Sequence, residues 1–191
     1  PPGDPQRYAL TLTQQVYRSV EGLRQPLPEA FDIYFLGQDK HRFETLRTLA
    51  EQWHSLGLRT CLRMVPEPGQ TYPPVPGLEV LAHSIDYPSN IDSINRARCL
   101  LEITQANQSG LTVRCLEALF FDKKLITNNP CVQTLPFYNP ARFFILGQDD
   151  PQALPAFLQA PMPPLPPGAL QPYDFAHWVQ QFDHITAPAR A

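Results

Sequence analysis

The chain has 191 residues, of which 43% are hydrophobic and 17% charged, and its net charge is −3. These values fit one globular α/β domain with attached segments, and they argue against disorder and against a basic nucleic-acid-binding surface. No apolar run approaches the ~18 residues of a membrane-spanning helix, so we expect at most peripheral membrane contact.

Apolar runs rich in aromatic and β-branched residues alternate along the chain with helical patterns, which is typical of a parallel sheet with helices on both faces. Strands are predicted at residues 31–36, 58–65, 78–82, 99–103, 124–127 and 143–146. Helices are predicted at residues 41–56, 89–97, 109–121, 151–158 and 174–185. We therefore expect a three-layer, Rossmann-like α/β fold.

Three parts of the chain differ in composition. Residues 1–28 are predicted to be a lead-in or linker, residues 29–160 the Rossmann-like domain, and residues 161–191 a proline-rich segment followed by a helix. The chain begins Pro1-Pro2-Gly3 without a methionine, so we expect it to be a fragment that lacks an amino-terminal part; the alternative is a processed chain, which would begin in the same way.

The first strand runs into a turn that carries a glycine and two cations. Gly37 ends the strand, and Lys40 and Arg42 lie at the start of the predicted helix 41–56. The free N–H groups of a helix start favour anions, so these cations are candidates for phosphate contact. The alternative is that they are ordinary solvated residues at a helix end.

Residues 98–129 form the most informative stretch, because they read as strand, loop, helix and strand. The strand 99–103 is apolar apart from Glu102, and Ser109 is a plausible N-cap for the helix that follows. Gly110 would let a ligand approach the backbone closely. In open parallel sheets ligands bind at the carboxyl ends of strands, so this turn is a candidate phosphate site.

Arg114 and Glu117 are the two charges inside an otherwise apolar helix, and their spacing places them on one face. In the functional interpretation they clamp a ligand, with Arg114 on phosphate and Glu117 on ribose hydroxyls. In the structural interpretation they form an ion pair on the one solvated stripe of the helix.

The segment SGLTVRCLEALFFDKKLIT at residues 109–127 resembles the donor-site segment of GT-B-fold glycosyltransferases. It is most similar to the CgeB-like group and to glycosyltransferases assigned to bacterial lipopolysaccharide and capsule synthesis. The resemblance extends upstream to FDIYFLGQDKHR and downstream to LPFYNPARFFILGQDD and YDFAHWVQQF, so it runs from about Asp4 to Phe182. The chain departs from the pattern at Asp122, where the family has a glycine, and at Gln108 and Ser109, where an acidic residue is common.

The resemblance implies a nucleotide-sugar-binding domain of a glycosyltransferase that builds bacterial surface polysaccharide. The donor-binding residues that it implies are Gly37, Lys40, Arg42, Ser109, Gly110, Leu111, Thr112, Arg114 and Glu117. The acceptor would be a saccharide or a lipid-linked saccharide, and the catalytic base would belong to the missing amino-terminal domain. We expect no cofactor and no metal, because helix starts and cations neutralise the leaving diphosphate.

Two other functions stay open from the sequence. One is a non-catalytic binding or structural module with a degenerate donor site, and the other is an enzyme similar to a nucleotide-sugar epimerase. The cysteines are predicted to be unpaired because they are widely spaced, which fits a cytoplasmic protein or one at the periphery of the inner membrane. They are Cys61, Cys99, Cys115 and Cys131.

Overall fold

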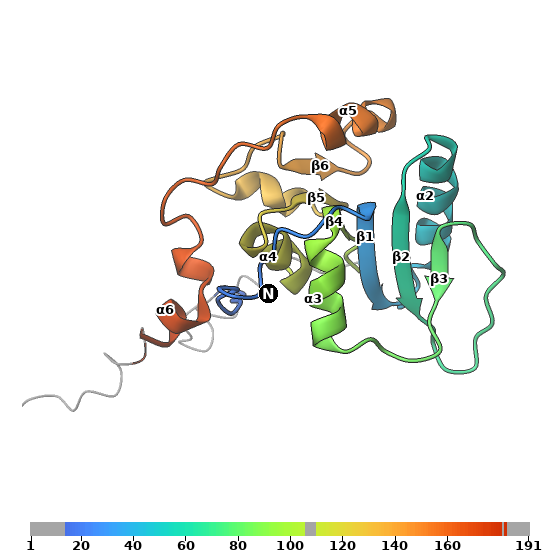
Figure 1. Ribbon diagram of the computed structural model, residues 1–191, viewed down its shortest axis with the longest axis horizontal. Coiled ribbons are helices and arrows are strands. Elements are labelled where there is room, and N and C mark those ends of the chain that lie inside the picture. The colour runs from blue at the N-terminus through green and yellow to red at the C-terminus, as the bar shows by residue number, and fades with distance from the viewer. Residues whose placement is uncertain (1–13, 106–109, 181, 183–191) are drawn as a thin grey trace, which may run out of the picture.

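The computed structural model describes residues 14–105, 110–180 and 182. Six parallel strands form one sheet in the order β3-β2-β1-β4-β5-β6 (Figure 1). The strands are β1 (Phe31–Gln38), β2 (Thr60–Val65), β3 (Leu78–Val80), β4 (Ala97–Glu102), β5 (Lys124–Thr127) and β6 (Phe143–Ile145). The predicted fold class, a Rossmann-like three-layer α/β domain, is confirmed.

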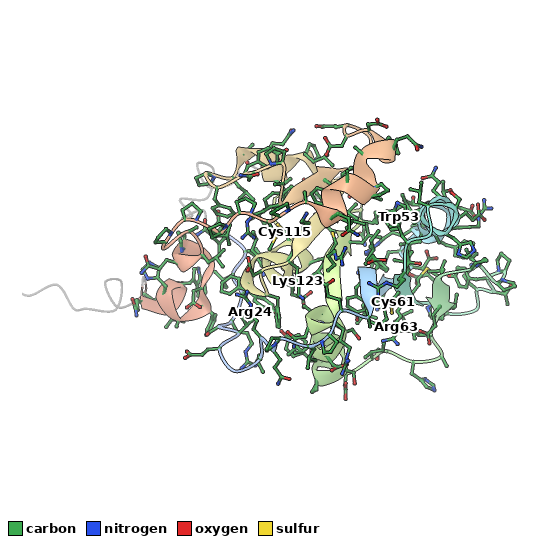
Figure 2. The ribbon with its side chains drawn as sticks, turned by 45° about the horizontal axis from the view of Figure 1, so that its top comes forward. Arg24, Trp53, Cys61, Arg63, Cys115 and Lys123 are labelled. Carbon is green, nitrogen blue, oxygen red and sulfur yellow. The ribbon has the colours of Figure 1, made fainter. Side chains whose placement is uncertain are left out.

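Helices cover both faces of the sheet. They are α2 (Phe43–Ser55), α3 (Tyr87–Asn95), α4 (Val113–Phe120), α5 (Leu154–Gln159) and α6 (Phe175–Gln180), with short 3-10 turns η1 (Pro130–Thr134), η2 (Pro151–Ala153) and η3 (Gln171–Tyr173). Side chains of α3 and α4 belong to one buried hydrophobic cluster, whereas those of α2 and α5 belong to another. Figure 2 labels one member of each cluster, Cys115 on α4 and Trp53 on α2.

The strand order reverses between β1 and β4. Strand β1 pairs with β2 on one side, through Ile33 opposite Thr60, and with β4 on the other, through Ile33 opposite Cys99. The connections after β1 and β4 therefore leave toward opposite faces, which opens a crevice between the carboxyl ends of these two strands. Ligands of doubly wound folds bind at this position.

Every predicted strand boundary agrees with the structure within two residues, but the helix predicted at 109–121 begins four residues late. Ser109 was expected to be its N-cap, and it lies outside the described residues. The N-cap is Thr112, which is extended and accepts a hydrogen bond from the Cys115 N–H on its hydroxyl. Serine and threonine have the same capping chemistry, so the sequence could not distinguish the two positions.

Helix α4 ends at a left-handed residue that is not glycine. Asp122 has φ 54°, and the N–H of Lys123 donates to the Ala118 carbonyl at 2.7 Å, as in a glycine-terminated helix. The Asp122 carboxylate lies 2.8 Å from both Arg24 and Arg142. These two ion pairs explain how an aspartate occupies the position where the resembling family has a glycine.

The proline-rich segment between α5 and α6 follows one side of the molecule (orange to red in Figure 1). Two buried cations donate to its carbonyl groups, since Arg142 Nε lies 2.7 Å from the Pro163 oxygen and Lys124 Nζ lies 2.7 Å from the Ala160 oxygen. Beyond it, Asp174 caps α6 by accepting from the N–H of Ala176 at 2.9 Å.

The four cysteines are free thiols, which confirms that part of the prediction. Within the described ranges, no helix has the length and apolar character that crossing a membrane requires.

Candidate functional site

Two adjoining cavities lie along the carboxyl edge of the sheet. The outer pocket has a volume of about 690 Å³ and is lined by Lys40, His41, Arg42, Thr45, Glu67, Gln70, Ile103, Thr104, Gln105 and Asn128. The inner pocket has a volume of about 260 Å³ and is lined by Phe35, Leu36, Arg42, Leu101, Glu102, Ile103, Thr112, Val113 and Arg114. The pockets share Arg42 and Ile103, and together they span the carboxyl ends of β1, β2, β4 and β5.

The turn between β1 and α2 supplies the cationic wall of the outer pocket. Lys40 and His41 both have positive φ, at 42° and 64°, a conformation that persists in non-glycine residues only where the surroundings hold it. The holding group is Asp39, whose carboxylate accepts from the N–H groups of Arg42 at 3.0 Å and Phe43 at 2.8 Å. Because a carboxylate already occupies this helix start, phosphate contact from the turn must come from the side chains.

Gly37 gives the Arg42 side chain its space. A Cβ at this position would lie 3.0 Å from the Phe35 ring and 3.4 Å from Arg42 Nη1, so any larger residue would displace one of them. Arg42 Nε is buried and has no hydrogen-bond partner within the described residues. Burial lowers the pKa of this guanidinium from its usual value, and the Asp39 carboxylate acts against that shift. Arg42 thus offers an unused donor at the junction of the two pockets.

A buried carboxyl group braces the start of α4. Glu102 accepts hydrogen bonds from the hydroxyl groups of Thr112 and Thr127, which joins β4, β5 and the N-cap of the helix. Burial raises the pKa of Glu102 above its usual value, although these hydroxyl groups act in the opposite direction. Val113, in the first turn of α4, lines the inner pocket, and its N–H has no partner among the described residues.

The loop before α4 is supported from β5. Gly110 has φ +86°, and its carbonyl accepts from the Asn129 side chain at 2.8 Å. Leu111 packs partly buried against the cluster beneath α4. Gly110 and Leu111 therefore shape the approach to the inner pocket, but neither lines it in the described part of the chain.

Arg114 and Glu117 form an ion pair of 2.8 Å, with side chains 14% and 5% exposed. The ion pair of the structural interpretation is therefore confirmed, whereas its solvated stripe is wrong, because both side chains are largely buried. Arg114 Nη2 donates to the Leu36 carbonyl at 3.0 Å, and its guanidinium lies 5.7 Å from the Tyr34 ring centroid. Nη1 lies at ion-pair distance from Glu117, yet it makes no well-directed hydrogen bond.

Glu117 is surrounded by partners from other elements. Its Oε1 accepts from the Asn90 amide at 3.3 Å and from the Tyr17 hydroxyl at 3.5 Å, while Oε2 faces Arg114 at 2.8 Å. Glu117 lines neither pocket, whereas Arg114 lines the inner one. Both oxygens of the carboxylate predicted to bind ribose are thus engaged within the protein.

Three polar residues of this region were not predicted from the sequence, namely Glu67, Glu102 and Asn129. Glu102 carried a usable signal, since it is the single charge in an apolar strand, but Glu67 lies in a proline-rich loop that reads only as surface. In the part of the chain that the structure describes, no three His, Cys, Asp or Glu side chains are grouped to hold a metal ion.

Comparison of the sequence with known protein-family models finds no match. Comparison with curated proteins finds no match either. Function is therefore inferred from the crevice, from its charges, and from the resemblance of residues 109–127 to a donor-site segment.

Proposed function

We propose that this chain is the nucleotide-sugar-binding domain of a glycosyltransferase that acts in bacterial surface polysaccharide synthesis. The observation that carries the proposal is a pair of arginines, Arg42 and Arg114, on one pocket at the point where the strand order reverses. Arg42 Nε is buried without a hydrogen-bond partner in the described part of the chain, whereas Arg114 Nη1 is paired with Glu117 at 2.8 Å. A diphosphate would supply an acceptor to Arg42, while Arg114 lines the pocket beside it.

The diphosphate of the donor occupies the junction of the two pockets. Arg42 contacts it there, the unpartnered N–H of Val113 adds a backbone donor, and Lys40 adds positive charge from the outer pocket. These groups stabilise the negative charge that develops on the leaving diphosphate without a metal ion. The rest of the donor extends into the outer pocket, whose volume lies within the usual range for ligand sites, ~300–1,000 Å³.

Replacement of Arg42 tests this proposal, because Arg42 makes no ion pair within the described residues. Titration calorimetry should show that Arg42→Ala weakens both inorganic diphosphate and nucleoside diphosphates by about ten- to a hundredfold, the equivalent of one charge-assisted hydrogen bond. The matched control is Arg47→Ala on α2, which removes an exposed arginine outside both pockets and should leave affinity unchanged. Absence of binding to the wild-type chain would contradict the proposal.

A second candidate is a non-catalytic binding module on the same fold. It is favoured by the ion pair between Arg114 and Glu117, because Glu117 is the carboxylate that the resemblance implies for ribose binding and it is already paired within the protein. Both candidates predict nucleotide binding, so only an assay of catalytic turnover distinguishes them. Release of nucleoside diphosphate from a nucleotide sugar in the presence of the intact enzyme supports the transferase, whereas binding without turnover supports the module.

A further inference from the structure

The outer pocket contains a carboxylate that is held by one oxygen and open at the other. Glu67 Oε1 accepts from the backbone N–H of Lys40 at 3.0 Å, whereas Oε2 has no hydrogen-bond partner in the described ranges. Glu67 is partly exposed and lines the cavity beside the cationic turn. A ligand in this pocket therefore meets an oriented anionic acceptor as well as cations.

The position of Glu67 is determined by the same turn that positions Arg42. The Tyr72 hydroxyl accepts from the Glu67 N–H at 3.2 Å and donates to the Asp39 carboxylate at 2.8 Å. Asp39 in turn holds the positive-φ conformation of Lys40, which directs its N–H toward Glu67. The end of β2 and the β1–α2 turn are thus joined before any ligand binds, so the carboxylate is preorganised.

The carboxylate predicted to bind ribose cannot do so in this structure. Glu117 is 5% exposed on its side chain, both of its oxygens have protein partners, and it lines neither pocket. Glu67 follows β2, the neighbour of the central strand β1. In doubly wound nucleotide-binding folds with this strand order, an acidic side chain downstream of the first βα turn accepts a hydrogen bond from a ribose hydroxyl.

We propose that Glu67 is a specificity-determining residue that accepts hydrogen bonds from the ribose hydroxyl groups of the bound nucleotide. The ligand is then a ribonucleoside diphosphate, with ribose in the outer pocket near Glu67 and phosphates near Lys40 and Arg42. A 2′,3′-dideoxy ligand lacks both hydroxyl groups, so it leaves Oε2 without a donor and binds more weakly. This inference rests on the proposed function, since it assumes that the crevice binds a nucleoside diphosphate.

Titration calorimetry on the 191-residue chain tests the inference with UDP, GDP, ADP and CDP, the 2′,3′-dideoxy form of the tightest of them, and inorganic diphosphate. We expect Glu67→Gln to weaken the ribonucleotide by about ten- to a hundredfold, and to leave the dideoxy form and inorganic diphosphate unchanged. The wild-type chain should itself discriminate against the dideoxy form by a similar factor, a comparison that needs no substitution. Glu51→Gln, on the exposed surface of α2, is the matched control and should change nothing.

Three outcomes would overturn the inference. Equal affinity of the wild-type chain for ribose and dideoxyribose forms would show that no carboxylate recognises the diol. Tighter binding of inorganic diphosphate by Glu67→Gln would show that Glu67 opposes the anion instead of binding the sugar. After either of these two outcomes, nucleotide binding and the proposed function would still stand. The third outcome, failure of every ligand to bind the wild-type chain, would refute both the inference and the proposed function.

Discussion

Charged residues on helix α4 and on the β1–α2 turn meet at one pocket, which Arg114 and Arg42 both line, yet the two regions differ in how their charges are paired. The Arg114 and Glu117 side chains find partners inside the protein, from Leu36 on β1, Asn90 on α3 and Tyr17 in the amino-terminal segment. Around the crevice, by contrast, two polar atoms have no hydrogen-bond partner within the described residues, namely Arg42 Nε and Glu67 Oε2. The charges on the helix thus stabilise the fold, while those on the turn line the crevice.

The difference follows from the free energy of burial. A buried polar atom without a partner destabilises the folded state by about 1–3 kcal/mol, so such atoms are rare unless a ligand completes them. The charges of Arg114 and Glu117 have partners within the protein, so substitution of either residue should affect stability. The crevice atoms Arg42 Nε and Glu67 Oε2 have no such partners in the described residues, so substitution of these residues should affect binding.

The largest effect is expected for Glu117→Ala. This change leaves the Arg114 guanidinium, 14% exposed, without its carboxylate, and breaking a buried pair in this way destabilises by about 3–5 kcal/mol. Urea unfolding followed by circular dichroism measures the loss. The control Glu44→Ala removes an exposed i,i+3 pair with Arg47 and should change stability by less than about 1 kcal/mol. Similar losses in the two variants would contradict the comparison.

A smaller loss, about 2 kcal/mol, is expected for Asp122→Gly, which removes the carboxylate that pairs with Arg142. This loss of stability is smaller than that for a fully buried pair, because the Asp122 side chain is 34% exposed although that of Arg142 is only 2% exposed. Asp122→Ala should be less stable than Asp122→Gly by a further ~1–2 kcal/mol, since alanine tolerates the φ of 54° poorly. Chemical denaturation of both variants separates the charge from the backbone contribution, and equal stabilities would refute the backbone part.

The smallest effect concerns Glu102 and pH. Because burial raises its pKa in the folded state, the folded protein binds the proton more tightly than the unfolded chain does. The stability associated with this group is therefore fully present below the unfolded pKa, about 4.3, and is lost as the pH rises through the higher folded pKa. Glu102→Gln should remove this dependence, whose slope is at most ~1.4 kcal/mol per pH unit.

Unfolding curves measured from pH 4 upward provide the test for Glu102. The wild-type chain should lose stability relative to Glu102→Gln as the pH rises. A parallel pair of stability curves would contradict the assignment of this proton to Glu102.

Strands such as β4 and β6 were predictable because they are largely apolar runs whose burial on both faces leaves a continuous sequence signal. The start of α4 was not predictable, since serine and threonine at positions 109 and 112 are equally suited to cap a helix. The hydrogen bonds of Thr112 to Glu102 and Cys115 determine the choice, and Glu102 belongs to a preceding strand.

The site was predictable only in its location. The carboxyl ends of β1 and β4 follow from the order of elements, and Lys40, Arg42 and Arg114 do line the crevice. The state of Glu117 was not predictable, because its partners Asn90 and Tyr17 lie 27 and 100 residues away in sequence. Helical spacing shows which residues share a face, but it does not show what covers that face.

The two ends of the described chain meet beside α4, and this has a consequence for the order of folding. Gln14 donates to the Pro172 carbonyl at 2.6 Å across a separation of 158 residues, and Tyr17 exchanges backbone hydrogen bonds with Tyr173 and Phe175. Closing so long a loop is entropically unfavourable until the intervening chain is compact. The contact between these two ends should therefore form after the sheet during folding and break before it during unfolding. Glu117 would then gain its hydrogen bond from Tyr17 late in folding and lose it early in unfolding.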